Sequence, residues 1–180
     1  MCTGWRHQCF YPFLFMKKII YIIPGLGEHC DLVRYKMLAK AIEDKGYKVN
    51  RINPDWYRPL SEQVFPIGKS TVVIGFSFGA ILAYLIVKKH PCKKVIFASI
   101  SPLHEFSFDS LVKDFREHML ESLAVEITTD IKCIKVSLKD IKTPFVTLAG
   151  KLEKMNADIL VPSTGHKITP AYIKCIVSLL

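Results

Sequence analysis

The sequence lacks the signatures of several classes of protein. Its six cysteines stand singly at positions 2, 9, 30, 92, 133 and 175, with no CxxC pair and no Cys/His cluster at zinc spacing. The pattern therefore indicates neither a redox motif nor a metal site. Single cysteines of this kind are typical of a reducing compartment, where they pack as small hydrophobic side chains. We expect a cytoplasmic protein.

Long apolar runs, dense basic runs and internal repeats are also absent from the sequence. No window reaches the roughly 18 apolar residues that a membrane-spanning helix needs. The net charge of +9 mildly favours acidic ligands or an anionic membrane surface, but the lysines are scattered, so we do not expect a nucleic-acid partner. The 180 residues, 50% hydrophobic and 23% charged, predict one globular domain with a continuous core.

The N-terminal 15 residues, MCTGWRHQCFYPFLF, are rich in aromatic side chains and have no periodicity. They lead directly into Met16-Lys17-Lys18 without the small-residue cleavage site of a signal peptide. We expect residues 1–16 to be a poorly ordered extension in front of a domain spanning 17–180. Two alternatives stay open: translation starts at Met16, or Met1–Phe15 is a short membrane-surface anchor.

From Lys17 onward, apolar strands alternate with segments of helical spacing. We predict strands at 19–24, 47–52, 71–75, 94–100, 143–149 and 158–161, and helices at 31–45, 78–89 and 170–180. Residues 53–70 are typical of a loop, and 101–142 is irregular, with partial helical periodicity over 106–123 and no clear preference over 125–136. Strands separated by helices need crossover connections. The fold class is therefore α/β, a three-layer α/β/α sandwich with a mainly parallel sheet of about six strands.

A serine lies between two glycines in GFSFG, at residues 75–79, where a predicted strand meets a predicted helix. So sharp a turn strains the serine backbone and brings strand and helix together, so the residues two before and two after must be very small. The Ser77 hydroxyl would project above the sheet at a helix N-terminus, which favours developing negative charge. The placement favours Ser77 as a nucleophile. The alternative is an inert serine in a glycine-rich turn.

A serine hydroxyl needs a base to take its proton, and the base needs a partner that fixes its tautomer. His166 lies in a loop after the last predicted strand, and we favour it as the base. His29, which follows the first strand, is an outside possibility. The remaining histidines fit less well because they lie in the N-terminal tail, at a helix end or in the irregular region: His7, His90, His104 and His118.

For the acid, Glu153 follows the strand at 143–149 and lies beside the same sheet edge. It is our first choice, and a solvated surface carboxylate is the alternative interpretation. Glu105 follows the fourth strand at the correct end and stays open as a competitor. Asp158 is the nearest competitor of Glu153, but it begins the next strand, toward the far end of the sheet.

The stretch Pro24-Gly25-Leu26-Gly27 follows the first strand. Its glycines allow a backbone N–H to point into the site, where it would form a two-donor oxyanion hole together with the N–H of Phe78. A plain strand-to-helix turn is the alternative.

These motifs follow one another in the order Ser, acid, His, and the chain from about residue 17 to its end resembles a small α/β-hydrolase. The matching stretches are IIYIIPGLG, GFSFG, LAGKLE and PSTGH. The resemblance implies a nucleophile at Ser77, a general base and acid at His166 and an orienting carboxylate at Glu153. It also implies that the backbone amides of Leu26 and Phe78 stabilise the oxyanion.

The activity that the resemblance implies is a serine hydrolase acting on a carboxylic ester or thioester through an acyl-enzyme. Its partner would be a small-molecule acyl ester, with no metal or organic cofactor. Membrane contact through the N-terminal segment is possible and not favoured. Five aromatic residues either line an apolar acyl pocket or belong to the core: Trp56, Tyr57, Phe76, Phe78 and Phe106.

The sequence departs from the family at several points. Pro24 stands where the family often has histidine, and Glu153 replaces the usual aspartate. The two antiparallel leading strands are lacking, so we expect a minimal sheet. The segment after Ile100, where family members insert a lid, is short enough that part of it must be core, so we expect little or no lid. The departures motivate an alternative function, a catalytically silent binding protein with the same fold.

Overall fold

The computed structural model describes residues 18–100, 107–117 and 119–180, and six strands form one sheet within them. The strand order is β2-β1-β3-β4-β5-β6, and every neighbouring pair is parallel. The predicted parallel sheet is confirmed. The strands are β1 (Ile19–Ile23), β2 (Lys48–Arg51), β3 (Val72–Phe76), β4 (Lys94–Ala98), β5 (Phe145–Gly150) and β6 (Ile159–Val161).

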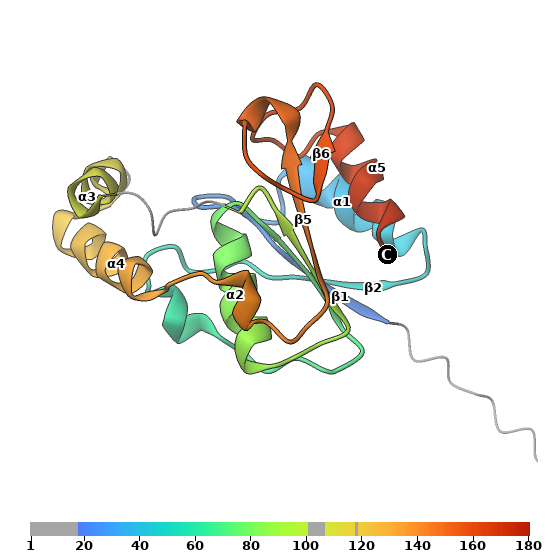
Figure 1. The fold of residues 1–180 in the computed structure, drawn as a ribbon, viewed down its shortest axis with the longest axis horizontal. Helices are drawn as coiled ribbons and strands as arrows, with labels where there is room; N and C mark the ends of the chain where they lie inside the picture. The colour runs from blue at the N-terminus through green and yellow to red at the C-terminus, as the bar shows by residue number, and fades with distance from the viewer. Residues whose placement is uncertain (1–17, 101–106, 118) are drawn as a thin grey trace, which may run out of the picture.

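Helices cover both faces of the sheet, as Figure 1 shows, which gives the predicted three layers. Helices α1 (Val33–Glu43) and α5 (Pro170–Ser178) lie on one face and α2 (Phe78–Lys89) on the other. Local chemistry sets their ends. Helix α1 stops before Gly46, whose φ of +85° suits glycine, and Thr169 caps α5 by accepting a hydrogen bond from the Tyr172 N–H.

The central strands are apolar throughout because both of their faces are covered. All five residues of β3 are buried, from Val72 to Phe76. One core cluster lies under α2 and the other under α1 and α5, with the sheet between them. The sheet is therefore a rigid platform from whose carboxyl ends the loops extend.

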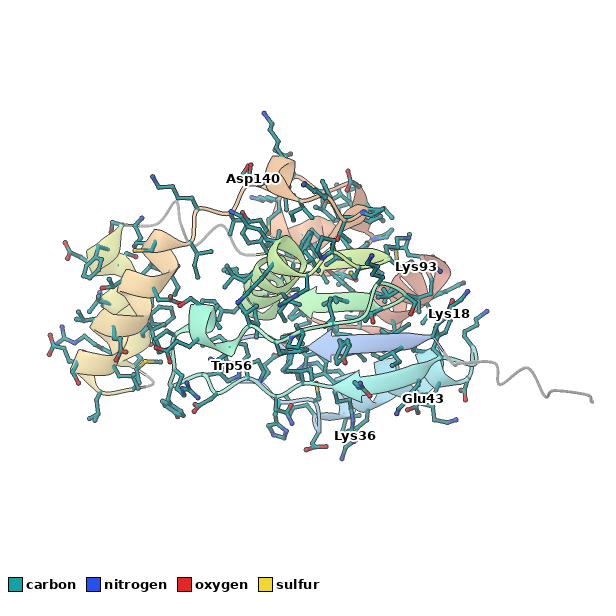
Figure 2. The ribbon with its side chains drawn as sticks, turned by 90° about the horizontal axis from the view of Figure 1, so that it is seen from below. Lys18, Lys36, Glu43, Trp56, Lys93 and Asp140 are labelled. Carbon is teal, nitrogen blue, oxygen red and sulfur yellow. The ribbon has the colours of Figure 1, made fainter. Side chains whose placement is uncertain are left out.

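Two further helices form between β4 and β5, and we call α3 (Phe108–Arg116) and α4 (Glu121–Cys133) together the helical cap. The cap helices pack against each other and lie beyond the carboxyl ends of the strands (Figure 2). Their apolar sides complete the core cluster under α2, so part of this segment is core, as expected. Most of the stretch 125–136, for which the sequence shows no preference, is helical.

Helix α4 is tied to the body of the protein through Asp130. Its carboxylate accepts hydrogen bonds from the backbone N–H of Leu60, at 2.8 Å, and of Ser61, at 3.3 Å, and from the Ser61 hydroxyl. These donors open the short 3-10 helix η1 (Leu60–Gln63), so the carboxylate caps η1 and holds the cap against the 53–70 loop.

The interior of α4 contains a buried hydroxyl, that of Thr128. Thr128 is fully buried, and its Oγ1 has no partner among the described residues. Because a buried polar group without a partner costs free energy, we expect Thr128→Val to raise the free energy of unfolding by about 1 kcal/mol, measured by urea denaturation. Thr129→Val is the matched control, since Thr129 is exposed and its hydroxyl donates to the Val125 carbonyl at 2.8 Å, so this substitution should not raise the free energy of unfolding. A destabilised Thr128→Val variant would contradict the prediction.

The cysteines inside the described residues are free thiols. Cys30 and Cys92 are buried, and burial raises the pKa of Cys30 to about 12, so it behaves as a small apolar side chain. Cys133 is exposed and Cys175 half-buried, while Cys2 and Cys9 lie outside the described residues, as does the N-terminal extension predicted for 1–16.

Over the ranges described, no helix is long and apolar enough to cross a membrane.

Candidate active site

Ser77 occupies a strained turn between β3 and α2. Its φ of +54° is left-handed, a region that residues with a Cβ rarely adopt. A Cβ on Gly75 would lie 2.5 Å from the Gly79 carbonyl oxygen, and a Cβ on Gly79 only 2.0 Å from that of Pro24. Both glycines are therefore required by close backbone approach. The turn holds the Ser77 hydroxyl at the carboxyl end of the sheet, next to the start of α2.

Ser77, His166 and Glu153 form one hydrogen-bonded chain. The His166 Nε2 lies 2.7 Å from the Ser77 Oγ, and its Nδ1 lies 2.7 Å from the Glu153 Oε2. The imidazole is half exposed, whereas only 5% of the Glu153 side chain is. The structure thus brings Ser77 within hydrogen-bonding distance of a histidine that lies 89 positions away in the sequence, and brings this histidine equally close to Glu153.

Glu153 is held by the end of β5 and the single turn η4 (Lys151–Glu153) that follows. Its Oε1 accepts hydrogen bonds from the Gly150 N–H at 2.6 Å and the Ser99 hydroxyl at 2.7 Å, which leaves Oε2 facing the imidazole. Gly150 has a second role. A Cβ there would lie 2.3 Å from the Thr164 carbonyl oxygen, so glycine lets the loop that contains His166 pack against the end of β5.

Two competing candidates that lie within the described residues, Asp158 and His29, are not part of this hydrogen-bonded chain. Asp158 accepts hydrogen bonds from the N–H and the hydroxyl of Thr147, both at 2.8 Å, and these bonds lower its pKa. His29 is exposed and contacts Asp31. Glu105 lies outside the described residues, as do His7, His104 and His118.

The Tyr35 hydroxyl holds the loop after β1 in place through a hydrogen bond, and we call this contact the Tyr35 clamp. The Gly25 N–H donates to the Tyr35 hydroxyl at 3.0 Å, and this hydroxyl in turn donates to the Glu28 carboxylate, which also pairs with Arg34. Burial, and then the bond to Glu28, raises the pKa of Tyr35, so its hydroxyl stays protonated. Sequence reasoning missed this clamp, because Tyr35 looks like an ordinary core residue of α1.

The Gly25 N–H is thus occupied, and the two predicted oxyanion donors are the N–H groups of Leu26 and Phe78. Neither the N–H of Leu26 nor that of Phe78 donates a hydrogen bond to another residue in the described part of the chain. Phe78 is the first residue of α2, where backbone N–H groups have no partner inside the helix. Leu26 lies in the loop after β1 and Phe78 directly follows Ser77, so both N–H groups belong to segments that adjoin the Ser77 turn.

A pocket of about 510 Å³ opens beside Leu26 and Gly27. Trp56, which contributes to its wall, lies beyond the carboxyl ends of the strands on the side of the helical cap (Figure 2). The ring of Phe78 packs between Trp56 and Phe115, with centroids 5.6 and 6.0 Å away. The residues that line the pocket are Leu26, Gly27, Trp56, Tyr57 and Met119.

The aromatic residues predicted for an acyl pocket divide into two groups. Trp56 and Tyr57 line the pocket, whereas Phe76 and Phe78 are buried. Phe76 packs against the His166 ring, at 5.1 Å between centroids, and so supports the imidazole. Phe106 lies outside the described residues.

Within the described ranges, no three His, Cys, Asp or Glu side chains are arranged to hold a metal ion.

No protein-family model matches the chain, and no curated protein matches its sequence. Solved structures do match its fold. An extracellular α/β-hydrolase from a Paenibacillus species, described as a structural and functional homologue of tobacco salicylic acid binding protein 2, is 12% identical with a TM-score of 0.52. The match covers 90% of this chain and 97% of that protein.

Two other solved structures are similar to the same extent. A lipase-esterase related protein from Clostridium acetobutylicum is 14% identical over 90% of this chain and 92% of its own, with a TM-score of 0.52. A deformylase of N-formylmaleamic acid from Pseudomonas putida is 12% identical over 89% and 92%, also at 0.52. At such identities the likeness establishes the fold, which is that of the α/β-hydrolases.

Proposed function

We propose that this α/β-hydrolase-fold chain is a serine hydrolase that cleaves a carboxylic ester or thioester through an acyl-enzyme. Ser77 would be the nucleophile, His166 the general base and acid, and Glu153 the carboxylate that orients the imidazole. The observation that carries the proposal is the hydrogen-bonded chain, with 2.7 Å on either side of the His166 ring. Both distances are within hydrogen-bonding range, so the proton can move from serine to imidazole without rearrangement.

In the first half of the reaction, the Ser77 Oγ attacks the substrate carbonyl while His166 Nε2 takes its proton. The N–H groups of Leu26 and Phe78 would stabilise the oxyanion that forms. Collapse of the tetrahedral intermediate breaks the ester bond, and His166 gives its proton to the leaving alcohol or thiol.

In the second half, His166 takes a proton from water, which attacks the acyl-enzyme. The acid is released and the Ser77 hydroxyl regains its hydrogen. Glu153 keeps the proton of the neutral imidazole on Nδ1 and stabilises the imidazolium that forms in each half-reaction. These steps use side chains and backbone amides alone, so the proposal calls for no cofactor.

Turnover of p-nitrophenyl esters of graded acyl length tests the proposed function. The Ser77→Ala variant is the blank, because it keeps the fold and removes only the hydroxyl. We expect release of p-nitrophenol by the wild type above this blank for at least one acyl length. A folded wild type that matches Ser77→Ala on every ester and thioester would overturn the proposal.

The pocket between the loop after β1 and the helical cap is the site that we assign to the acyl group. Its walls carry apolar surface from Leu26, Trp56 and Met119, and its volume of about 510 Å³ exceeds what an acetyl group fills. Burial of each additional methylene in such a pocket stabilises the bound acyl group by about 0.8 kcal/mol. The proposed substrates therefore carry a medium-length or aromatic acyl group.

Tyr57 provides the cleanest test of this pocket, since its side chain lines the cavity and is 60% exposed. We expect Tyr57→Ala to lower kcat/KM for p-nitrophenyl hexanoate by about 10-fold and for the acetate by less than about twofold, because only the longer acyl group contacts the ring. Tyr57→Phe, which keeps the apolar area, is the matched control. Equal losses with both esters would place the acyl group elsewhere.

A further inference from the structure

We propose that Ser99 and Tyr172 are positioning residues for Glu153, and that their hydroxyls form a relay of hydrogen bonds directed at its carboxylate. The inference rests on the function proposed above for the same site. Sequence reasoning did not single out either residue, because Ser99 stands at the end of β4 without flanking glycines and Tyr172 matches the apolar spacing of α5.

The backbone of Ser99 is held in a conformation that disfavours serine. Its φ is +48°, in the left-handed region that glycine adopts freely, and the residue is fully buried. A side chain at such a φ is strained. What serine provides here and glycine lacks is a hydroxyl 2.7 Å from the Glu153 Oε1. Of the four non-glycine residues with positive φ in the described ranges, two are Ser77 and Ser99, at the ends of neighbouring strands.

The direction of the relay follows from counting hydroxyl hydrogens. Ser99 and Tyr172 have one hydrogen each and make three close contacts, to Glu153, to each other at 2.7 Å and from Tyr172 to the Leu148 carbonyl at 3.0 Å. An ionised carboxylate only accepts, so Ser99 donates to Glu153. The Ser99 oxygen can then only accept at the 2.7 Å contact, so the Tyr172 hydrogen is directed at Ser99 and shared with the Leu148 carbonyl, which accepts from Tyr172 at 3.0 Å and from the Ser99 N–H at 2.6 Å.

Burial raises the pKa of Tyr172, so its hydroxyl remains a donor across the range in which the enzyme would work. Phe76 packs edge-on against its ring at 6.0 Å and against the His166 ring at 5.1 Å. The Phe76 ring therefore packs against both Tyr172, at one end of the hydrogen-bonded chain, and the His166 imidazole.

The relay has a particular use in a chain whose acid is glutamate. Glutamate has one more rotatable bond than aspartate, and so more rotamers in which its carboxylate would miss the imidazole. Donors from Gly150 and Ser99 both bind Oε1, which fixes the rotamer and leaves Oε2 to accept from His166. Hydrogen bonds to a charged group are among the stronger ones, so the relay is suited to holding this geometry.

The test compares Ser99→Ala, Ser99→Gly and Tyr172→Phe with wild type in kcat and KM. We expect the two Ser99 variants to lower kcat by about 10- to 100-fold and Tyr172→Phe by about three- to 10-fold, with KM within about twofold. Ser99→Gly relieves the backbone and removes the hydroxyl, so its low kcat separates the hydroxyl from strain. Tyr84→Phe is the matched control, because Tyr84 is also buried and its hydroxyl bonds the Lys135 carbonyl on another part of the protein.

A double-mutant cycle distinguishes positioning from a structural role. In a Glu153→Ala background, Ser99→Ala should change the residual kcat by less than about twofold, because there is no carboxylate left to orient. The same fold-loss in both backgrounds would mean that Ser99 acts on the fold rather than through Glu153, and would overturn the inference.

A second readout does not depend on turnover. The downfield proton of the His166 Nδ1–Glu153 hydrogen bond, observed by NMR, should be present in wild type and Tyr84→Phe and be broadened or lost in Ser99→Ala. An inactive wild type would refute the proposed function, while this resonance would still report the relay. An unchanged resonance in Ser99→Ala, or Ser99→Ala and Tyr172→Phe with wild-type kcat, refutes the relay alone.

Discussion

Glu153→Gln is expected to lower kcat by about 10³- to 10⁴-fold while the protein stays folded. The glutamine has nearly the shape of glutamate, but its amide can donate a hydrogen bond to His166 Nδ1. The imidazole then carries its proton on Nε2, the atom that lies 2.7 Å from the Ser77 Oγ. A protonated Nε2 cannot take the serine proton, so the nucleophile is not activated.

Steady-state kinetics and a thermal melt of the same preparation check this prediction. Asp158→Asn is the matched control, because Asp158 bonds Thr147 and makes no contact with the imidazole. It should leave kcat within about twofold of wild type. Unchanged activity of Glu153→Gln would contradict the orienting role that we propose for Glu153.

Of the substitutions proposed for this protein, Gly79→Ala is expected to lower the free energy of unfolding most. The new Cβ would lie 2.0 Å from the Pro24 carbonyl oxygen and 2.6 Å from that of Ile23, both of which are backbone atoms at the end of β1. Relief requires α2 to move away from the sheet, which opens the core under that helix. We expect a loss of about 4 kcal/mol or more, which for a chain of this size lowers the Tm by about 10 °C or more.

Gly68→Ala serves as the control for this substitution. Its Cβ would meet only the Thr71 Oγ1 at 3.5 Å, an ordinary contact, so the melting temperature should change by no more than about 2 °C. Calorimetry of both variants measures the difference. A Gly79→Ala protein as stable as Gly68→Ala would mean that strand and helix are not held at the described approach.

The parts of the fold that the sequence predicts are those with a local cause. The apolar run of β1, the stop at Gly46 and the GFSFG turn each act over a few residues, and the elements around them form as expected. The approach of Ser77, His166 and Glu153 could also be expected, because each follows a strand at the same edge of a parallel sheet.

What the sequence could not predict depends on packing between distant segments. The helices of the cap form where the pattern is weakest, because their apolar sides are completed by α2 and the 53–70 loop. The contacts of Ser99 with Glu153 and with Tyr172 span 54 and 73 positions. No local spacing marks such pairs. The positive φ of Ser99 is the feature that distinguishes it, and it is a property of the structure.

The central claim is that one activated hydroxyl lies at the turn between β3 and α2. A fluorophosphonate tests this claim, because activated nucleophilic serines attack it and ordinary serines do not. The adduct is measured by intact mass and located by peptide mapping on the wild type and on Ser77→Ala. We predict one adduct per wild-type chain, on Ser77, and none on the variant. A folded wild type that never reacts would contradict the account and leave the fold as a silent binding scaffold.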